Sequence, residues 1–381
     1  MTSTAEIPEF PMTRAAGCPF DPPPAARALQ AEAPLARVRL WDGSTPWLVT
    51  RYAEQRSLLA DPRVSADITR PGYPSPAPLP KGGTGISFIL MDNPEHARLR
   101  RMVTAPFTIR RVAAMRPAVQ RIVDEQIDRL LAGPKPADLV EAFALPVPSL
   151  VICELLGVPY TDHGFFQENS KVIIRRDAKP EERAAGHRAL VGYLDRLMGE
   201  KLAAPGDDLL SGLAGRVHAG ELSRTEAAQM GVLLLIAGHE TTANMIALGT
   251  LALLEHPDQL ALLRESADPA LVASAVEELL RYLNITHNGR RRVALEDIEV
   301  AGETIRAGEG LILANDVANR DPEVFPDGDR LDLTRDSLEL QVVYGTLYRR
   351  IPTLALATDV ERVPFKHDGS VYGVYELPVT W

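Results

Sequence analysis

The feature that most constrains the fold is a single helical pattern of about 30 residues. Ser223, followed three residues later by Glu226, forms a capping-box pattern that begins a helix, and Glu255-His256-Pro257 ends it. At 1.5 Å per residue such a helix is roughly 45 Å long, enough to cross a whole domain. Its middle part, Met230 to Leu254, is largely apolar. A helix this long and this apolar is expected to lie buried at the centre of its domain.

The polar residues in this apolar segment argue against a membrane span. His239, Glu240, Thr241, Thr242 and Asn244 would lie at bilayer depth, where each polar group is costly. The sequence therefore favours a buried helix with a functional polar patch. Gly238 is interpreted as a position where another group approaches the backbone.

Composition excludes several functional classes. A formal net charge of −10 is unfavourable for nucleic-acid binding, which needs clustered Lys and Arg. Two cysteines, Cys18 and Cys153, are too few for a disulfide framework. The N-terminal segment Met1 to Phe20 lacks the basic start and apolar run of a signal peptide. We therefore expect a cytoplasmic protein with no nucleic-acid or membrane partner.

The remaining patterns predict a mainly α fold with small β-sheets, in one domain spanning residues 1–381. Alternation of apolar and polar residues around Asp42-Gly43-Ser44 predicts a hairpin, and the C-terminal segment Arg362 to Trp381 alternates again around His367-Asp368-Gly369. Short strands are expected between Arg292 and Ala314. The Pro/Gly-rich segment Pro71 to Gly85 predicts an irregular loop, which is either a lid or a disordered segment. Helices are expected at Pro94–Phe107, Ile109–Ala132, Leu145–Gly157, Glu181–Ala203 and Asp268–Tyr282.

Four local patterns occur in a fixed order along the chain. They are His96-x-x-x-Arg100, the run Ala237-Gly238-His239-Glu240-Thr241-Thr242, the pair Glu278-x-x-Arg281 with Arg330 further on, and Arg292 at the start of a strand. Each has an ordinary structural explanation. The first can be a solvated i,i+4 pair, Thr241 can bond back to its own helix, and Arg292 can be surface charge.

Together, and with Ala318-Asn319-Arg320-Asp321-Pro322 after the Glu-x-x-Arg pair, these patterns resemble the soluble bacterial cytochrome P450 family. The resemblance implies a cytochrome P450 fold with heme as cofactor. It implies that His96, Arg100 and Arg292 bind heme propionates and that Ala237 and Gly238 line the oxygen-binding groove. It also implies that Glu240 and Thr241 are catalytic in proton relay, and that Glu278, Arg281 and Arg330 form a buried structural triad.

The family's cysteine loop is missing from this sequence. A Phe-x-x-Gly run leading to Cys-x-Gly should follow Leu331-Asp332-Leu333, but Ser337 passes directly into Leu338. The fold is therefore expected to be incomplete at the proximal cysteine loop, with about twenty residues absent between these two positions. Without the thiolate the chain is not expected to oxygenate a substrate, and no heme is expected in it.

Neither cysteine is expected to replace the absent one, because Cys18 lies in a proline-rich segment and Cys153 in an apolar helix. His239 or His287 could bind the iron instead, but no second ligand or metal-binding spacing accompanies them. No metal site is predicted from protein ligands.

Three functions remain compatible with this sequence. The first is a P450 monooxygenase whose cysteine loop either belongs to the working protein but is missing from this sequence, or was lost recently from its gene. Such an enzyme would hydroxylate or epoxidise an apolar small molecule, either a secondary metabolite or a xenobiotic. Its electron donor would be a ferredoxin. The second is a heme-free auxiliary protein that binds and activates a partner enzyme, such as a glycosyltransferase. The third is a heme-free cyclase that uses the old substrate pocket, with Glu240 as general acid or base.

Overall fold

The structure is a computed structural model. It describes residues 6–15, 17, 19–76, 78, 88–175, 178–266, 268–286, 289–335, 343–367 and 371–381. Cys18, His287, the junction between Ser337 and Leu338, and most of the Pro71 to Gly85 segment lie outside these ranges. The chain forms two compact units. One contains residues 1–83, 89–96 and 280–331, and the other contains residues 84–88, 97–279 and 332–381. That these units form a single domain stays a prediction.

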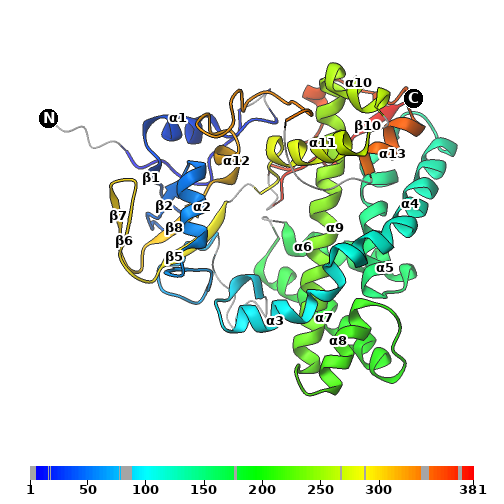
Figure 1. Ribbon diagram of the computed structural model, residues 1–381, viewed down its shortest axis with the longest axis horizontal. Coiled ribbons are helices and arrows are strands. Elements are labelled where there is room, and N and C mark those ends of the chain that lie inside the picture. Colours follow the sequence, from blue (N-terminus) through cyan, green and yellow to red (C-terminus); the bar gives the residue numbers. More distant parts are fainter. Residues whose placement is uncertain are drawn as a thin grey trace. The chain divides into compact units, whose positions relative to one another are not determined.

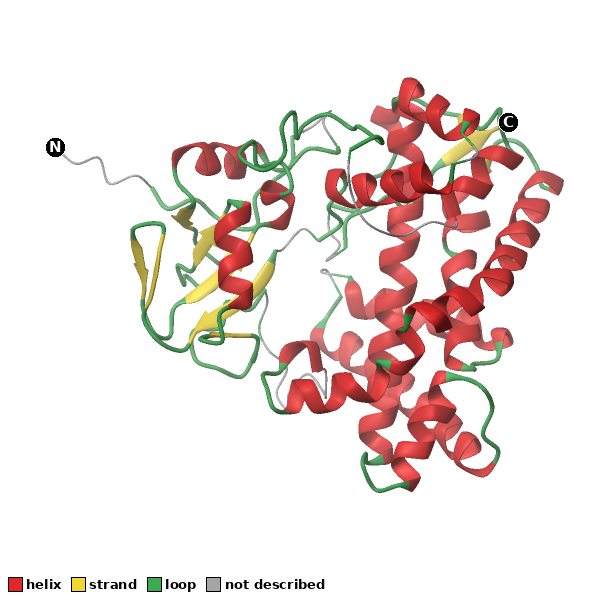
Figure 2. Ribbon diagram, in the orientation of Figure 1, coloured by secondary structure: helices red, strands yellow, loops and turns green. Residues whose placement is uncertain are grey.

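The first unit is built on a five-stranded sheet (Figures 1 and 2). Its strand order is β1-β2-β8-β5-β3, and only the β2–β8 pair is parallel. The bounds are β1 Leu35–Arg37, β2 Trp47–Val49, β3 Val64–Ser65, β5 Arg290–Ala294 and β8 Gly310–Leu313. A separate hairpin joins β6 (Ile298–Val300) to β7 (Glu303–Ile305). The predicted first hairpin is confirmed, since Leu35 pairs with Val49 and Arg37 with Trp47.

Both faces of the sheet are covered around β2 and β8, which explains why these two strands are apolar at every position. Trp47, Val49, Leu311 and Leu313 pack with Leu58 of α2 (Tyr52–Ala60) in one buried cluster. The alternate residues Leu48 and Ile312 pack in another with Ala26 of α1 (Pro24–Glu32). Successive strand residues point to opposite faces, so a strand covered on both sides has no polar side. The short helix α12 (Asn315–Ala318) follows β8.

The second unit is helical and is organised around α9 (Arg224–Glu255) (Figure 1). The predicted start is confirmed. The backbone N–H of Glu226 donates to Ser223 Oγ over 3.1 Å, and the N–H of Ser223 donates to Glu226 Oε2 over 2.8 Å. Helix α9 packs against α5 (Pro146–Leu156), α7 (Pro180–Ala203) and α8 (Leu209–His218). It is long and apolar enough to cross a membrane, but 56% of that stretch is buried inside the protein, as in the core helix of a soluble protein.

The other helices of this unit are α4 (Ile109–Ala132), α6 (His163–Ile174), α10 (Pro257–Glu265) and α13 (Val343–Arg350). Helices α3 (Glu95–Val103) and α11 (Pro269–Tyr282) each begin in one unit and end in the other. Short 3-10 helices occupy Phe88–Leu90, Ala105–Phe107, Tyr160–Asp162 and Val360–Arg362, and a π-helical turn occupies Val140–Ala144. A three-stranded sheet orders β4 (Ala137–Asp138), β10 (Pro378–Thr380) and β9 (Ala355–Leu356). The mainly α fold with small sheets is confirmed.

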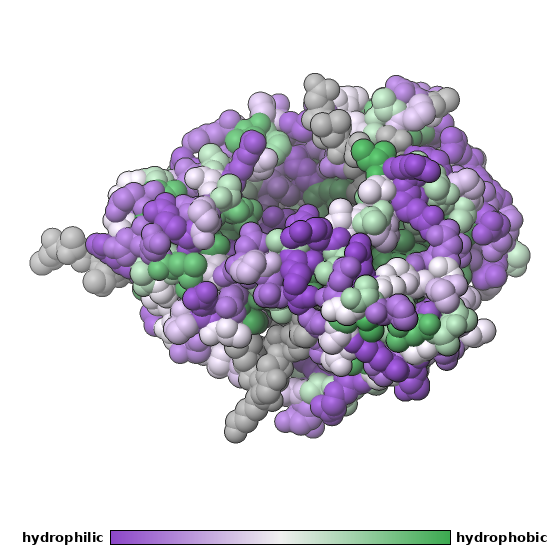
Figure 3. Space-filling view, turned by 60° about the horizontal axis from the view of Figure 1, so that its bottom comes forward, coloured by the Kyte–Doolittle hydropathy of each residue, from purple (hydrophilic) through white to green (hydrophobic). Residues whose placement is uncertain are grey.

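The face shown in Figure 3 is mostly hydrophilic, with separate hydrophobic patches. The most exposed large apolar side chain among the described residues is Ile109, at 80% of its full area, at the start of α4. Phe107 and Val112, on either side of it in sequence, are about half exposed, at 49% and 50%. Exposed apolar side chains that lie together often mark a contact surface.

Candidate functional site

Glu240 is the centre of the candidate site, in the middle of α9. Its side chain is buried, with 5% of the residue exposed. The Nδ2 of Asn244, one turn further along the helix, donates to Glu240 Oε2 over 3.4 Å and to the backbone oxygen of Glu240 over 2.6 Å. The Nζ of Lys366 lies 3.9 Å from Glu240 Oε2. A buried carboxylate needs such partners, because burial without them is costly.

The C-terminal segment that supplies Lys366 is held as a narrow antiparallel loop. Phe365 and Val374 form a β-bridge, and the N–H of Lys366 donates to the oxygen of Gly373 over 2.8 Å. A Cβ on Gly373 would lie only 1.7 Å from Asn244 Oδ1, so glycine is needed for this loop to reach α9. The alternation around His367-Asp368-Gly369 thus coincides with a single antiparallel β-bridge and not with a pair of strands, and residues 368–370 lie outside the described ranges.

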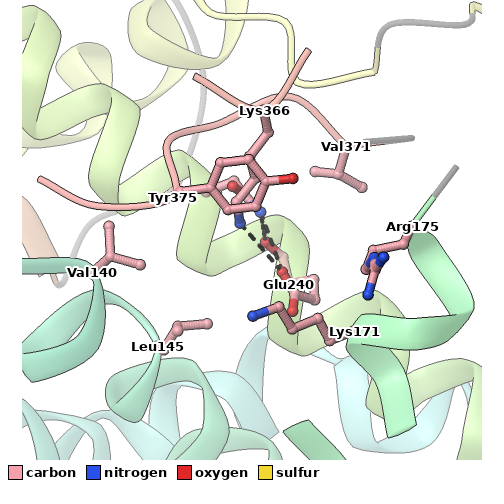
Figure 4. Close-up of a pocket in the computed structure, with 9 residues that line it drawn as sticks. Val140, Leu145, Lys171, Arg175, Glu240, Lys366, Val371 and Tyr375 are labelled. Atoms are coloured by element: carbon pink, nitrogen blue, oxygen red, sulfur yellow. Dashed lines mark hydrogen bonds and ion pairs between the residues drawn. The ribbon is translucent and has the colours of Figure 1, made fainter. Parts of the chain in front are cut away.

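A cavity of about 90 Å³ lies beside the Glu240 carboxylate (Figure 4). Its walls come from four places in the second unit. Helix α9 supplies Glu240 and Asn244, the end of α6 supplies Lys171 and Arg175, the C-terminal loop supplies Lys366, Val371 and Tyr375, and the turn before α5 supplies Val140 and Leu145. The cavity lining thus contains three cationic side chains and one carboxylate, and several of its other side chains are apolar. The cavity can accept a small polar or anionic group.

Thr241, predicted to work with Glu240, makes a local bond instead. Its Oγ1 donates to the backbone oxygen of Ala237 over 2.5 Å, one turn back in α9. This is the bond by which a threonine satisfies its hydroxyl within its own helix. In this structure the hydroxyl of Thr241 is therefore not directed at the Glu240 carboxylate. The proton-relay role of the pair stays a prediction.

Gly238 has a packing explanation. A Cβ added there would lie 3.0 Å from the Cδ1 of Ile152 on α5. The group that approaches the backbone at this point is thus a side chain of the neighbouring helix. Ala237, the other predicted groove residue, is exposed and accepts the hydrogen bond from Thr241. Their roles in cofactor binding stay predictions.

His239 is buried beside Glu240, with 3% of the residue exposed. Its Nε2 has no hydrogen-bond partner among the described residues. Burial lowers the pKa of this imidazole, which favours its neutral form, and nearby Lys366 lowers it further while Glu240 opposes the shift. No group of three or more His, Cys, Asp and Glu side chains among the described residues is placed to bind a metal ion.

The three predicted propionate-binding residues fall in different units. His96 and Arg292 belong to the first unit, and Arg100 belongs to the second, although His96 and Arg100 lie one turn apart on α3. Arg292 is partly buried on β5, where burial lowers the pKa of its guanidinium despite the nearby Tyr73 and Asp92. His96 is half-buried and Arg100 is exposed. Their use as a clamp on an anionic group stays a prediction.

Of the predicted triad, Glu278 and Arg281 are buried whereas Arg330 is exposed, and the triad stays a prediction. Arg330, its third member, has an exposed side chain, and it takes part through its backbone oxygen, which accepts from Arg281 over 3.2 Å. The Oε2 of Glu278 instead lies 3.3 Å from the Nε of Arg335, and its Oε1 accepts from the N–H of Asp332. Sequence reasoning missed Arg335. Arg335 lies three residues after Asp332, whose backbone N–H donates to the same Glu278 carboxylate. This spacing is the sequence signal that could have indicated Arg335.

Heme, which the resemblance implies, does not fit the one thiol that the structure describes. Cys153 lies on α5 and is 3% exposed. Burial raises its pKa to about 11, with a further contribution from Asp162, so the sulfur is protonated at neutral pH. Iron ligation requires the thiolate. Cys153 is therefore unsuitable as an axial ligand, as predicted from its apolar surroundings.

The comparisons with known proteins agree in one family. The sequence model described as Cytochrome P450 matches residues 206–337. The chain is 55% identical to cytochrome P450 GfsF of Streptomyces halstedii over 400 residues, covering 99% of this chain and 97% of that protein. It is 53% identical to cytochrome P450 CYP105Q4 of Mycobacterium marinum over 405 residues, covering 98% of this chain and 96% of that one.

Solved structures give the same result. The crystal structure of GfsF superposes with a TM-score of 0.89 at 54% identity, covering 98% of this chain and 100% of that one. The mycinamicin VIII C21 methyl hydroxylase MycCI of Micromonospora griseorubida, bound to mycinamicin VIII, superposes with a TM-score of 0.89 at 39% identity, covering 98% and 100%. The match to GfsF extends over 400 positions, whereas this chain has 381 residues, so at least 19 positions of that relative have no counterpart here.

Proposed function

Because the chain belongs to the cytochrome P450 family, whose typical members are heme-thiolate monooxygenases, we propose that its ancestral reaction is hydroxylation or epoxidation of an apolar small molecule. In its present sequence the chain does not form the heme-thiolate centre and does not carry out this reaction. It retains the scaffold and the small-molecule cavity beside α9. A ferredoxin would be the electron donor of the ancestral reaction, and the cytoplasm would be its compartment.

The proposal depends on one observation, which is that neither cysteine of the chain is placed to supply a heme thiolate. Of the two cysteines in the sequence, Cys153 is buried as a thiol, and Cys18 lies in a proline-rich stretch far from Leu331-Asp332-Leu333, where the family's loop should follow. Two further findings support an internal deletion. The match to the family ends at residue 337, and the relatives have positions that this chain lacks.

The substrate class is proposed from the relatives. MycCI is described as a hydroxylase bound to mycinamicin VIII, and this chain covers all of that protein's length. The apolar members of the cavity wall, Val140, Leu145 and Val371, are compatible with a largely apolar ligand. A secondary metabolite is therefore the class of molecule that we propose for the ancestral reaction.

An absorption spectrum tests the absence of the heme-thiolate centre. The purified full-length chain is reconstituted with hemin, reduced and exposed to carbon monoxide. We expect no Soret band at the thiolate position. The matched variant carries the corresponding loop of GfsF between Ser337 and Leu338, and we expect the thiolate band to appear in it. A thiolate band from the unaltered chain would contradict the proposal.

Activation of a partner enzyme is a second candidate, favoured by the exposed apolar residues Phe107, Ile109 and Val112. Arg110 lies among them, while Arg111 is paired with Asp207, so a partner surface that is apolar with an acidic group opposite Arg110 would match. A glycosyltransferase is the kind of enzyme that heme-free members of the family activate. Coexpression with a glycosyltransferase, followed by a transferase assay, tests this candidate. Ile109→Ser should abolish any activation, whereas Val324→Ser, at an exposed apolar residue of the other unit, should leave it unchanged.

A further inference from the structure

We infer that Gly373, in the C-terminal loop, limits the size of the ligand that the cavity beside Glu240 accepts. This inference rests on the proposed function, because it takes the cavity to receive a small molecule. It goes further in assigning the size limit to a positioning residue that does not itself line the cavity. Gly373 acts through the cavity wall that the C-terminal loop forms against α9.

The contact between Gly373 and Asn244 of α9 leaves no room for a side chain. A Cβ at residue 373 would lie 1.7 Å from Asn244 Oδ1 and 2.5 Å from its Cγ. Gly373 does not have the positive φ that favours glycine, so this contact, and not the backbone conformation, excludes a side chain here. Asn244 is 2% exposed and its amide donates to Glu240, which hinders it from turning away. A side chain at residue 373 would therefore push the C-terminal loop away from α9.

A shift at Gly373 would reach the cavity wall, because the two arms of the C-terminal loop are bonded to each other. The N–H of Lys366 donates to the oxygen of Gly373 over 2.8 Å, and the N–H of Tyr375 donates to the oxygen of Pro364 over 2.8 Å. Lys366, Val371 and Tyr375 are the residues by which the loop lines the cavity. A displacement of Gly373 is therefore expected to move this part of the lining with it.

The opposite side of the cavity belongs to other elements. Figure 4 shows Leu145 and Lys171 across the cavity from Tyr375. The N–H of Leu145 donates to the oxygen of Val140 over 2.9 Å, which closes the π-helical turn, and this turn packs against α9 and α4. Lys171 lies on α6, which packs against α7. Withdrawal of the C-terminal loop would leave these residues in place, so the cavity would become larger.

The cavity volume of about 90 Å³ predicts a low size limit, since a dry cavity of about 150 Å³ holds one benzene ring. Linear primary alcohols are suitable probes. Their hydroxyl can donate to the Glu240 carboxylate, and their chain can contact Val140, Leu145 and Val371. Each enclosed methylene group strengthens binding, whereas one that stays in water adds nothing. The chain length at which the affinity stops rising therefore measures the space that the loop leaves.

Ligand-observed NMR titration of the full-length chain with the alcohols from ethanol to octanol tests the inference. We expect the affinity of the wild type to stop rising at a short alcohol. In Gly373→Ala the rise should continue for about two further methylene groups, so that octanol binds about tenfold more tightly to it than to the wild type. Asn244→Gln crowds the same contact from the α9 side and should raise the limit in the same direction, so the test does not depend on the folding of one variant.

The matched control is Gly212→Ala, at an exposed glycine of α8 where an added Cβ would meet nothing within 4 Å. It should keep the wild-type size limit. Asn244→Ala removes the Oδ1 and Cγ atoms that crowd residue 373, so adding Gly373→Ala to it should raise the limit no further. An unchanged limit in Gly373→Ala and Asn244→Gln, or an equal rise with and without Asn244→Ala, would overturn the inference, while the proposed small-molecule cavity would stand. Binding of no alcohol to any of these proteins would overturn both.

Discussion

Gly238 on α9 and Ile152 on α5 lie so close that a methyl group at residue 238 would require the Ile152 side chain to shift. A Cβ at Gly238 would lie 3.0 Å from the Cδ1 of Ile152, tighter than ordinary van der Waals contact. Ile152 is itself buried, with 7% of the residue exposed. The two helices therefore approach each other through a glycine, one residue before His239 and two before Glu240. This contact limits how closely α5 and α9 can approach each other beside His239 and Glu240.

We expect Gly238→Ala to destabilise the protein by about 1 kcal/mol. Overpacking of a core contact costs about 1–3 kcal/mol, while alanine is favoured over glycine within a helix by about 1 kcal/mol. Ile152→Val removes the crowding methyl group, so the double variant should be more stable than the sum of the single effects predicts. Urea denaturation of all four proteins measures this coupling. Strictly additive changes would show that the two side chains do not compete for space.

The boundaries of α9 could be predicted from the sequence because they are set by local interactions. The capping box at Ser223 and Glu226 involves residues three apart, and Pro257 ends the helix through its own ring. The reason for Gly238 could not be predicted in this way. It depends on Ile152, which is distant in sequence, and a single sequence does not say which helix faces which.

The ion pair between Lys366 and Glu240 should contribute to stability. Their side chains are 17% and 7% exposed, so the pair is largely shielded from water. We expect Lys366→Met to destabilise the protein by about 1–3 kcal/mol, because it removes one charged partner of a buried carboxylate. Glu240→Gln in the same chain should recover part of this loss. If thermal denaturation shows Lys366→Met to be neutral at low and high salt, the contact at 3.9 Å contributes nothing measurable.

The ion pair between Lys366 and Glu240 also shows which part of the site could be predicted from the sequence and which part could not. Glu240 was predicted because a carboxylate within an apolar helix is unusual. Lys366, Lys171 and Arg175 were missed, since each lies in a polar stretch where a cation is unremarkable. The cavity brings these three cations together with Glu240 from three segments of the chain. Arg335 was missed for the same reason, because only the fold places it against Glu278.

Cys153 should be inert towards thiol reagents in the folded protein. Burial raises its pKa to about 11, so only a very small fraction is thiolate at pH 8. Labelling with a disulfide reagent at this pH should give the same fast phase for the wild type and for Cys153→Ala. After unfolding in urea, the wild type should show one more reactive thiol than the variant. Rapid labelling of Cys153 in the native protein would contradict the buried position of its sulfur.

His239 should make the stability of the protein depend on pH below neutrality. Burial lowers the pKa of this imidazole in the folded protein, so the unfolded chain binds a proton more readily than the folded one. Stability is then highest above the unfolded-state pKa of about 6.5 and decreases as the pH falls below it. We expect His239→Gln to reduce the loss of stability between pH 7.5 and 5.5, measured by urea denaturation across this range. His218→Gln, at an exposed histidine of α8, is the matched control and should keep the wild-type slope. An unchanged slope in His239→Gln would mean that the buried imidazole is not the source of the pH dependence.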